Sequence, residues 1–391
     1  LGSAASSPPA MREPALAEPL REVSMNPRPW LELHPQKRGE IFRNLPVHAK
    51  IYQDMYDHED FGDYWKQKGL YTAGYYKLIK DVPTFFLSGW YDYFGEGTLD
   101  NFAALARMHK TPKKLLMGPW PHGIGRSVCG DGDFGPSAAV DMQALALDWF
   151  DHWMKDDPFD VAPAEPVRLF RMEGRGGQWR TASSWPPAGV RPSKYYIQAG
   201  GSLSPQRPGD AAPSSFVYDP ENPVPTAGGR YQGCVQNQAP LDARADILRF
   251  STAPLAAPVE VTGKVRARLW ISSDAVDTDF TAKLIDVHPD GYAMILTDGV
   301  IRTRYRSGHE KSVPMKPGTI YEVAIDLGST SNLFARGHRI RLDVSSSNFP
   351  RIEPNPNTGE PAGRWTRRIK ARNTVYHDSK RGSYVELPVQ G

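Results

Sequence analysis

The chain has 391 residues, enough for two or three domains and a sizeable buried core. Charged residues make up 23% of it and the formal net charge is +3, a balance that predicts neither a nucleic-acid partner nor a membrane-surface partner. The sequence contains no apolar run long enough to span a bilayer, so no membrane segment is expected.

The two cysteines, Cys129 and Cys234, are too few for the disulfide framework of a small secreted scaffold. They favour a reducing, cytoplasmic compartment, although the sequence leaves open a single disulfide between them. They are also too few for a cysteine-based metal site, and we expect no metal and no cofactor.

The N-terminal stretch is rich in Ala, Ser and Pro and has no apolar core, so it resembles neither a signal peptide nor a packed element. We therefore expect residues 1–39 to be disordered or linker-like. Residues 40–80 are polar and aromatic with helical spacing. Within them, Asp60 is predicted to cap a helix, and its neighbours His58 and Glu59 are not expected to bind metal with it, because adjacent residues do not share a helix face.

Residues 81–160 alternate between strand and helix patterns. Val82 to Asp92 is a short apolar run that ends in Gly and an acid, which is typical of a buried parallel strand followed by a loop. Lys114 to His122 repeats this pattern with a His in the loop. Helices are predicted after each strand, over Gly97 to Lys110 and Ser137 to Lys155. The order strand–helix–strand–helix indicates an α/β unit.

Prolines between Asp156 and Pro166 predict a linker and a domain boundary. Beyond it, residues 165–391 contain many short β-type runs separated by turn signals. This is the pattern of an all-β sandwich or jelly roll. The clearest runs are Val167 to Arg171, Lys194 to Ile197, Val259 to Ile271, Phe280 to Val287, Tyr321 to Ile325 and Ile340 to Val344.

Asp92 and His122 are the candidate catalytic residues. Taken singly, an Asp after a strand is usually a turn or cap residue, and a His in a loop is usually just exposed. At the ends of successive parallel strands, however, they match the acid and base of an α/β hydrolase, which follow the nucleophile in chain order. The carboxylate would then hold one imidazole nitrogen and direct the other at a serine hydroxyl.

The local sequence around both residues resembles that of the cocaine-esterase and X-prolyl dipeptidyl-peptidase (peptidase S15) family of serine hydrolases. Gly89-Trp-Tyr-Asp92 and Gly118-Pro-Trp-Pro-His122 are similar to its acid and base motifs. Further motifs are similar to the family's C-terminal domain, in the correct order: Asp219 to Gly229, Ala257 to Gly263, Ser273 to Leu284 and Ser345 to Pro350. The resemblance covers about Leu45 to Pro388.

The resemblance implies a partial α/β-hydrolase domain with a helical cap (residues 40–80) and C-terminal strands (81–160), followed by a jelly-roll, galactose-binding-like domain (165–391). In the family, an earlier stretch supplies the serine elbow and an oxyanion-hole tyrosine. This sequence contains no Gly-x-Ser-x-Gly motif. Ser127 and Ser137 lie in imperfect versions of it and are interpreted as ordinary loop or cap residues, and Ser88 lies inside the predicted strand.

We therefore expect this chain to be a truncated or processed piece, or a subunit whose mate carries the serine. The open, apolar sheet edge predicts such a partner, either a missing N-terminal hydrolase segment or another subunit, and leaves a homo-oligomer open. The alternative hypothesis is a non-catalytic jelly-roll binding module or an inactive hydrolase remnant.

The expected partner is a small-molecule ester or X-prolyl amide, cleaved through an acyl-enzyme, and the sequence leaves the choice between them open. Phe94 matches a position that lines the acyl pocket in cocaine-esterase-like members, with simple core packing as its alternative. Amino-acid-ester hydrolases of the family place carboxylates just after the acid. Tyr93 and Phe94 occupy that stretch here, which argues against this subclass, while Glu96 keeps the question open.

Overall fold

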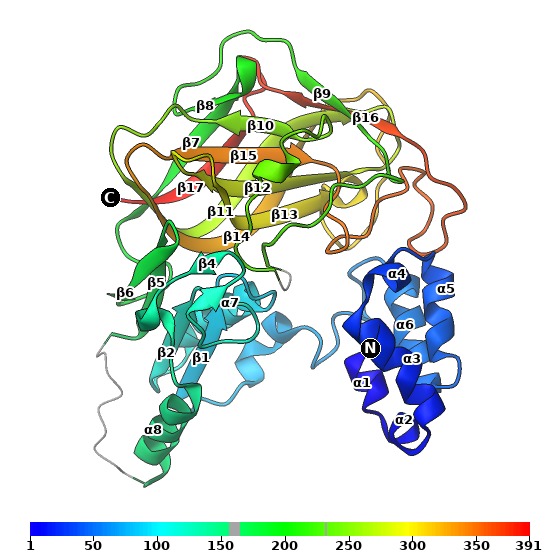
Figure 1. Ribbon diagram of the computed structural model, residues 1–391, viewed down its shortest axis with the longest axis vertical. Coiled ribbons are helices and arrows are strands. Elements are labelled where there is room, and N and C mark those ends of the chain that lie inside the picture. Colours follow the sequence, from blue (N-terminus) through cyan, green and yellow to red (C-terminus); the bar gives the residue numbers. More distant parts are fainter. Residues whose placement is uncertain (156–164, 231–232) are drawn as a thin grey trace.

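The computed structural model describes residues 1–155, 165–230 and 233–391. Figure 1 shows three parts: a bundle of helices from the N-terminal region, a small α/β unit, and a large β domain that both of them contact. The expected linker at 156–166 lies mostly outside the described residues. An α/β part followed by a β domain is the predicted order, and its details differ from the prediction in the three ways described next.

Residues 1–39 are helical, so the expectation of a disordered or linker-like stretch is wrong. Alanines and Leu20 from these helices pack with Phe42 and Leu45 into a small core of their own. Pro8, Pro14 and Pro35 stand at helix N-termini, where the missing N–H costs nothing and the fixed φ suits a helix, while Pro19 lies inside the helix Pro14–Met25. The helices are α1 (Gly2–Ala5), α2 (Pro8–Arg12), α3 (Pro14–Met25), α4 (Arg28–Leu31) and α5 (Pro35–Gly39).

Residues 40–80 are partly helical, through η1 (Glu40–Phe42), α6 (Pro46–Asp57) and η2 (Thr72–Leu78). The helix predicted to begin at Asp60 is absent, and turns stand in its place. The Asp60 Oδ1 atom accepts hydrogen bonds from the Tyr305 hydroxyl and the Ser312 amide, each at 3.0 Å. Both of these partners of the carboxylate lie in the β domain and not in its own segment.

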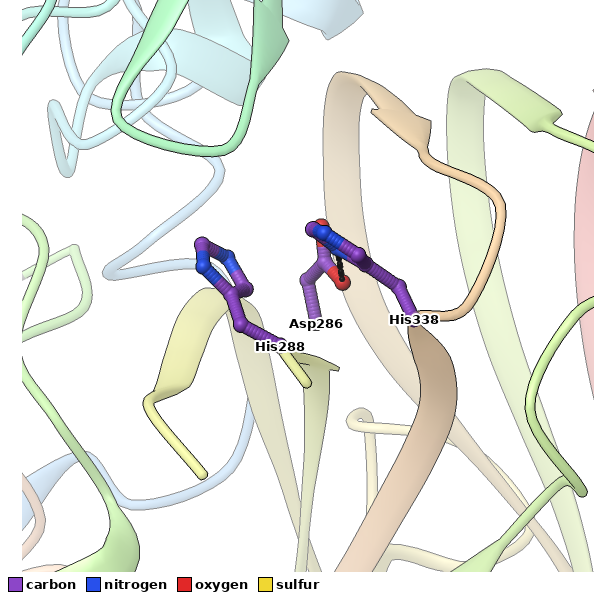
Figure 2. Close-up of side chains that lie close together, drawn as sticks. All are labelled: Asp286, His288 and His338. Atoms are coloured by element: carbon purple, nitrogen blue, oxygen red, sulfur yellow. Dashed lines mark hydrogen bonds and ion pairs between the residues drawn. The ribbon is translucent and has the colours of Figure 1, made fainter. Parts of the chain in front are cut away.

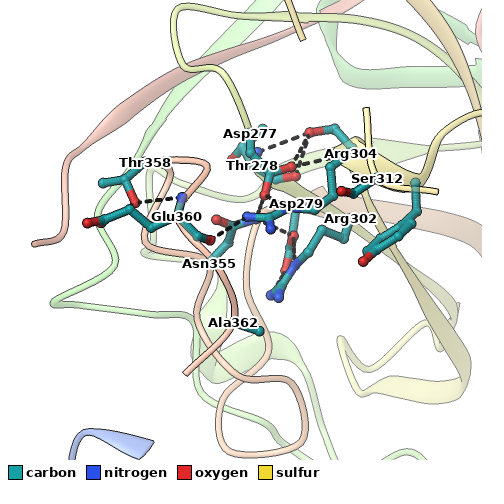
Figure 3. Close-up of polar contacts among 12 residues, drawn as sticks. Asp277, Thr278, Asp279, Arg302, Arg304, Ser312, Asn355, Thr358, Glu360 and Ala362 are labelled. Carbon is teal, nitrogen blue, oxygen red and sulfur yellow. Dashed lines mark hydrogen bonds and ion pairs between the residues drawn. The ribbon is translucent and has the colours of Figure 1, made fainter. Parts of the chain in front are cut away.

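A polar network joins this N-terminal region to the β domain, and Figure 3 shows the β-domain part of it around Asp277, Asp279 and Arg304. The Arg304 guanidinium lies 2.7 Å from buried Asp277 and 3.2 Å from Glu59. Arg302 pairs with buried Asp279 at 2.9 Å. The network therefore uses the Glu59 carboxylate as a partner of Arg304.

The α/β unit is a short parallel sheet of β1 (Thr84–Gly89), β2 (Lys113–Gly118) and β5 (Val167–Glu173). Helix α7 (Gly95–Met108) connects β1 to β2, and α8 (Met142–Lys155) follows β2, close to the predicted elements. Strand β5 pairs with β2 in parallel and with β6 (Gly176–Ala182) in antiparallel orientation. The parallel sheet therefore extends past residue 165, where the β domain was expected to begin.

The β domain is a curled antiparallel arrangement that continues from β5 through a single bridge to β14. In β11, buried Val265, Ala267 and Leu269 alternate with Arg266 and Arg268, and this alternation places one face in the common core. The strands are β7 (Val190–Gln198), β8 (Ser202–Ser204), β9 (Ser214–Tyr218), β10 (Leu248–Ser251), β11 (Val259–Ser273), β12 (Asp279–Val287), β13 (Ala293–Arg302), β14 (Tyr321–Phe334), β15 (Arg339–Ser345), β16 (Ala371–Tyr376) and β17 (Tyr384–Gln390). Short elements between them are η4 (Ala199–Gly201), η5 (Ala239–Leu241) and η6 (Thr303–Tyr305).

Cys129 and Cys234 form a disulfide, the bridge that the sequence left open. Cys129 belongs to the small hairpin of β3 (Val128–Cys129) and β4 (Gly132–Asp133), which lies between β2 and η3 (Pro136–Ala138). Cys234 belongs to the β domain, so the bridge connects the two parts. Within the described ranges, no helix has the length and apolar character needed to cross a membrane.

Candidate active site

The loops that carry Asp92 and His122 are brought together by the register of β1 and β2. Gly89 pairs with Gly118, so both strands end at the same level. The loops then continue the pairing, because the Tyr91 amide donates to the Trp120 carbonyl at 3.0 Å. A Cβ at Gly89 would lie 2.1 Å from that carbonyl oxygen, and one at Gly118 would lie 2.3 Å from the Trp120 ring. Only glycine permits this close approach.

Asp92 and His122 lie in contact, with Nδ1 of His122 3.3 Å from Oδ2 of Asp92. The carboxylate is buried and has two further donors, the Ser88 hydroxyl at 3.1 Å and the Phe94 amide at 2.9 Å. The His122 side chain is 61% exposed. A fixed carboxylate at Nδ1 leaves Nε2 as the nitrogen that can reach a second group.

Two aromatic rings border the imidazole. The Tyr93 ring lies 5.2 Å and the Phe94 ring 5.3 Å from that of His122, and both side chains are about half exposed. Within this chain, Phe94 is therefore exposed beside the imidazole and is not packed in the core. An apolar surface beside an accessible imidazole could bind a flat acyl group.

The serines considered from the sequence take other roles. Ser88 Oγ is buried and donates to the acid itself. Ser137 lies in η3, where its carbonyl accepts a hydrogen bond from Trp179, and the Ser127 carbonyl accepts one from the Phe134 amide. Within the described residues, the His122 imidazole bonds to Asp92 and to no serine hydroxyl.

Glu96, one turn beyond the acid, faces the β domain rather than His122. Its carboxylate lies 3.0 Å from Arg230 and 3.3 Å from Lys264, and it accepts hydrogen bonds from the amide and the hydroxyl of Ser329 at 2.5 and 3.2 Å. Burial alone would raise the pKa of Glu96, but Arg230, Lys264 and the Ser329 amide outweigh it and hold that pKa below its ordinary value. These partners occupy the carboxylate that could otherwise have bound a substrate ammonium.

Two buried aromatic residues anchor the acid loop at its other end. The Trp90 indole donates to the Phe170 carbonyl of β5 at 2.7 Å, and the Tyr91 hydroxyl donates to the Ile295 carbonyl of β13 at 3.0 Å. Both side chains also belong to the core shared with the β domain. The interface between the two parts is therefore mixed, with apolar packing, directed hydrogen bonds and the ionic Glu96 cluster.

The sequence is similar to known serine hydrolases along most of its length. Residues 8–124 match the family described as X-Pro dipeptidyl-peptidase (S15 family), and residues 160–386 match the X-Pro dipeptidyl-peptidase C-terminal non-catalytic domain. The chain is 36% identical over 362 residues to the cocaine esterase of Rhodococcus sp. (strain MB1 Bresler). The chain belongs to this S15 and cocaine-esterase family of serine hydrolases.

Two solved hydrolase structures share the fold. An aminopeptidase from a marine sediment Thaumarchaeota archaeon matches with a TM-score of 0.79 at 25% identity over 88% of this chain and 60% of its own. An alpha-amino acid ester hydrolase matches with a TM-score of 0.80 at 26% identity over 90% and 62%. The cocaine-esterase match covers 87% of this chain and 61% of that protein, so the chain spans about three fifths of its relatives' length.

Proposed function

We propose that this chain supplies the acid and base of a serine-hydrolase triad, Asp92 and His122, and that the nucleophilic serine comes from another segment or subunit. The observation that carries the proposal is the buried carboxylate held against Nδ1 of an imidazole that is itself exposed. Membership of a serine-hydrolase family supports it, as does the absence of a Gly-x-Ser-x-Gly motif from the sequence.

In this mechanism Nε2 of His122 takes the proton of the serine hydroxyl as the oxygen attacks the acyl carbon. The resulting imidazolium returns the proton to the leaving alcohol or amine as the acyl–serine ester forms. Water then attacks that ester by the same route and releases the acid and the free serine. Asp92 fixes the tautomer of His122 and stabilises the imidazolium, and it does not take the proton itself.

The outer edge of the parallel sheet is where the completing segment would bind. Among the described strands, β1 pairs with β2 on one side only. Helix α8 exposes a set of large apolar side chains, Leu147, Phe150, Trp153 and Met154. An open strand edge beside exposed apolar side chains is a surface that another segment or subunit would cover.

The substrate class we propose is an ester or an X-prolyl amide with a flat or apolar acyl part resting on Phe94. The similarities support both bond types, because one relative is a cocaine esterase and the matched family is described as X-Pro dipeptidyl-peptidase. The test compares kcat/KM for aryl esters, X-prolyl amides and amino-acid esters with the longest natural form of the protein. Preference for amino-acid esters would contradict the role given to Glu96, and inactivity towards all three classes would favour a non-catalytic binding module.

A further inference from the structure

A second group of chemically capable side chains lies in the β domain, away from the acid–base pair. Asp286, His288 and His338 offer ligand atoms that all lie within 4.8 Å of one another. Figure 2 shows the carboxylate and both imidazoles gathered at the ends of their strands. The hydrolase mechanism proposed above does not involve them.

The strand register explains why these three residues meet. β12 and β15 are antiparallel, with Asp286 opposite Ile340 and Val287 opposite Arg339. Continuing this register by one residue places His288 opposite His338. His288 directly precedes a turn, and His338 directly follows one. Residues two apart share a face of a strand, so all three side chains project on the same side.

Asp286 and His338 are held in place by hydrogen bonds, whereas His288 has an unsatisfied ring nitrogen. Oδ1 of the fully buried Asp286 lies 2.8 Å from Nδ1 of His338, and its Oδ2 accepts a hydrogen bond from Asn332 at 3.1 Å. The two imidazoles lie 4.4 Å apart, centroid to centroid. Nε2 of His288, by contrast, is shielded from solvent and has no hydrogen-bond partner among the described residues. A buried polar atom without a partner destabilises the folded state, and a ligand bound to it would remove that cost.

We propose that Asp286, His288 and His338 bind a divalent transition-metal ion of the Zn²⁺ class. Two imidazoles and one carboxylate are the donor set of such ions, whereas Ca²⁺ and Mg²⁺ prefer oxygen ligands. Ligands roughly 2.1 Å from a tetrahedral ion lie about 3.4 Å apart, so the His288 side chain rotates toward the other two on binding. The ion displaces the proton shared by His338 and Asp286, and a water molecule completes the coordination.

The place of the site in the fold gives the ion a structural role. A Cβ at Gly174, in the turn between β5 and β6, would lie 3.5 Å from the His288 ring. The site therefore stands where the parallel sheet meets the ends of β12 and β15. An ion bound there stabilises the folded chain in proportion to the logarithm of its concentration over its Kd.

The experiment is a titration of the chelator-treated full chain with ZnCl₂, followed by calorimetry and thermal unfolding, with MgCl₂ as the comparison. We expect about one equivalent of Zn²⁺ to bind and to raise Tm, and Mg²⁺ to do neither. His288→Ala and His338→Ala should each weaken Zn²⁺ binding more than about 10-fold. Two control variants should retain it: His309→Ala, which removes an exposed imidazole, and His122→Ala, which removes the other Asp–His pair.

Co²⁺ provides a readout on the unmodified chain, in case a variant fails to fold. A tetrahedral nitrogen and oxygen site gives strong visible absorption that added Zn²⁺ abolishes. Absence of Zn²⁺ binding, weak octahedral Co²⁺ absorption, or binding unchanged in a folded His288→Ala protein would each overturn the proposal. The three side chains would then form a hydrogen-bonded cluster only.

Discussion

The molecule contains two Asp–His pairs built from the same atoms in different surroundings. In both, a buried carboxylate meets Nδ1 of the imidazole, at 3.3 Å in Asp92–His122 and 2.8 Å in Asp286–His338. The His122 side chain is 61% exposed, whereas that of His338 is 13% exposed. The carboxylate fixes a tautomer in each case, and the exposure of the ring decides whether its other nitrogen can exchange protons with a substrate.

The largest expected effect comes from making the same change in both pairs. Asparagine can replace the Nδ1–H donor of histidine but has no equivalent of Nε2. In the complete enzyme, His122→Asn should lower kcat by about 10⁴-fold, because the proton acceptor is lost. His338→Asn should leave kcat within about twofold. Equal losses of kcat in the two folded variants, measured under saturating substrate, would remove the distinction between the pairs.

A smaller effect is expected from the Glu96 cluster, which ties the first pair to the β domain. Glu96→Gln leaves Arg230 and Lys264 without their shared carboxylate, so we expect a loss of about 2 kcal/mol in the free energy of unfolding. Glu322→Gln is the matched control, since the Arg268–Glu322 pair spans 4.0 Å and is nearly half exposed, and its loss should be below about 0.5 kcal/mol. Urea titration measures both. A Glu96→Gln protein as stable as the control would show that the cluster does not anchor the loop.

The same cluster predicts a dependence of stability on pH. The pKa of Glu96 in the folded chain lies below its ordinary value of 4.5. Folding therefore favours the ionised carboxylate, and this contribution is complete above pH 4.5 and is lost as the pH falls through the folded-state pKa. The stability difference between the wild-type chain and Glu96→Gln should shrink on acidification below that range. A difference that grows there would reverse the assigned sign.

The smallest effect is expected at Phe94, whose ring borders the exposed imidazole but is absent from the core. Phe94→Ala should change stability by less than about 0.5 kcal/mol. It should lower kcat/KM for benzoyl esters about 10-fold through lost apolar contact, while acetyl esters of the same alcohol change little. Equal losses for the two acyl groups would assign Phe94 to positioning the loop instead.

Local sequence patterns predicted the two strands that position Asp92 and His122. The apolar runs before Asp92 and His122 gave both parallel strands, because a buried strand needs apolar residues on both faces. The partners of Glu96 could not be found this way, since Arg230 is 134 residues away and only the folded chain brings them together. The predicted helix cap at Asp60 was wrong for the same reason, since the partners of its carboxylate, Tyr305 and Ser312, are also distant in sequence.

The N-terminal helices were missed although the sequence contained a signal for them. Pro8, Pro14 and Pro35 each stand at the first position of a helix, a placement that composition alone does not distinguish from a linker. Their positions relative to Ala-rich runs would have indicated helices. The register that places His288 beside His338 depends on pairing between strands far apart in sequence, so it had no local signal.

The central claim is that the chain carries the acid and base while the nucleophile lies elsewhere. It is tested most directly by the intact mass of the 391-residue chain, and of its longest natural form or partner, after treatment with a fluorophosphonate probe. We expect no adduct on this chain and one adduct on the longer form or the partner, lost when His122→Asn is introduced. Stoichiometric labelling of a serine within these 391 residues, with Ser127 the first to examine, would contradict the account.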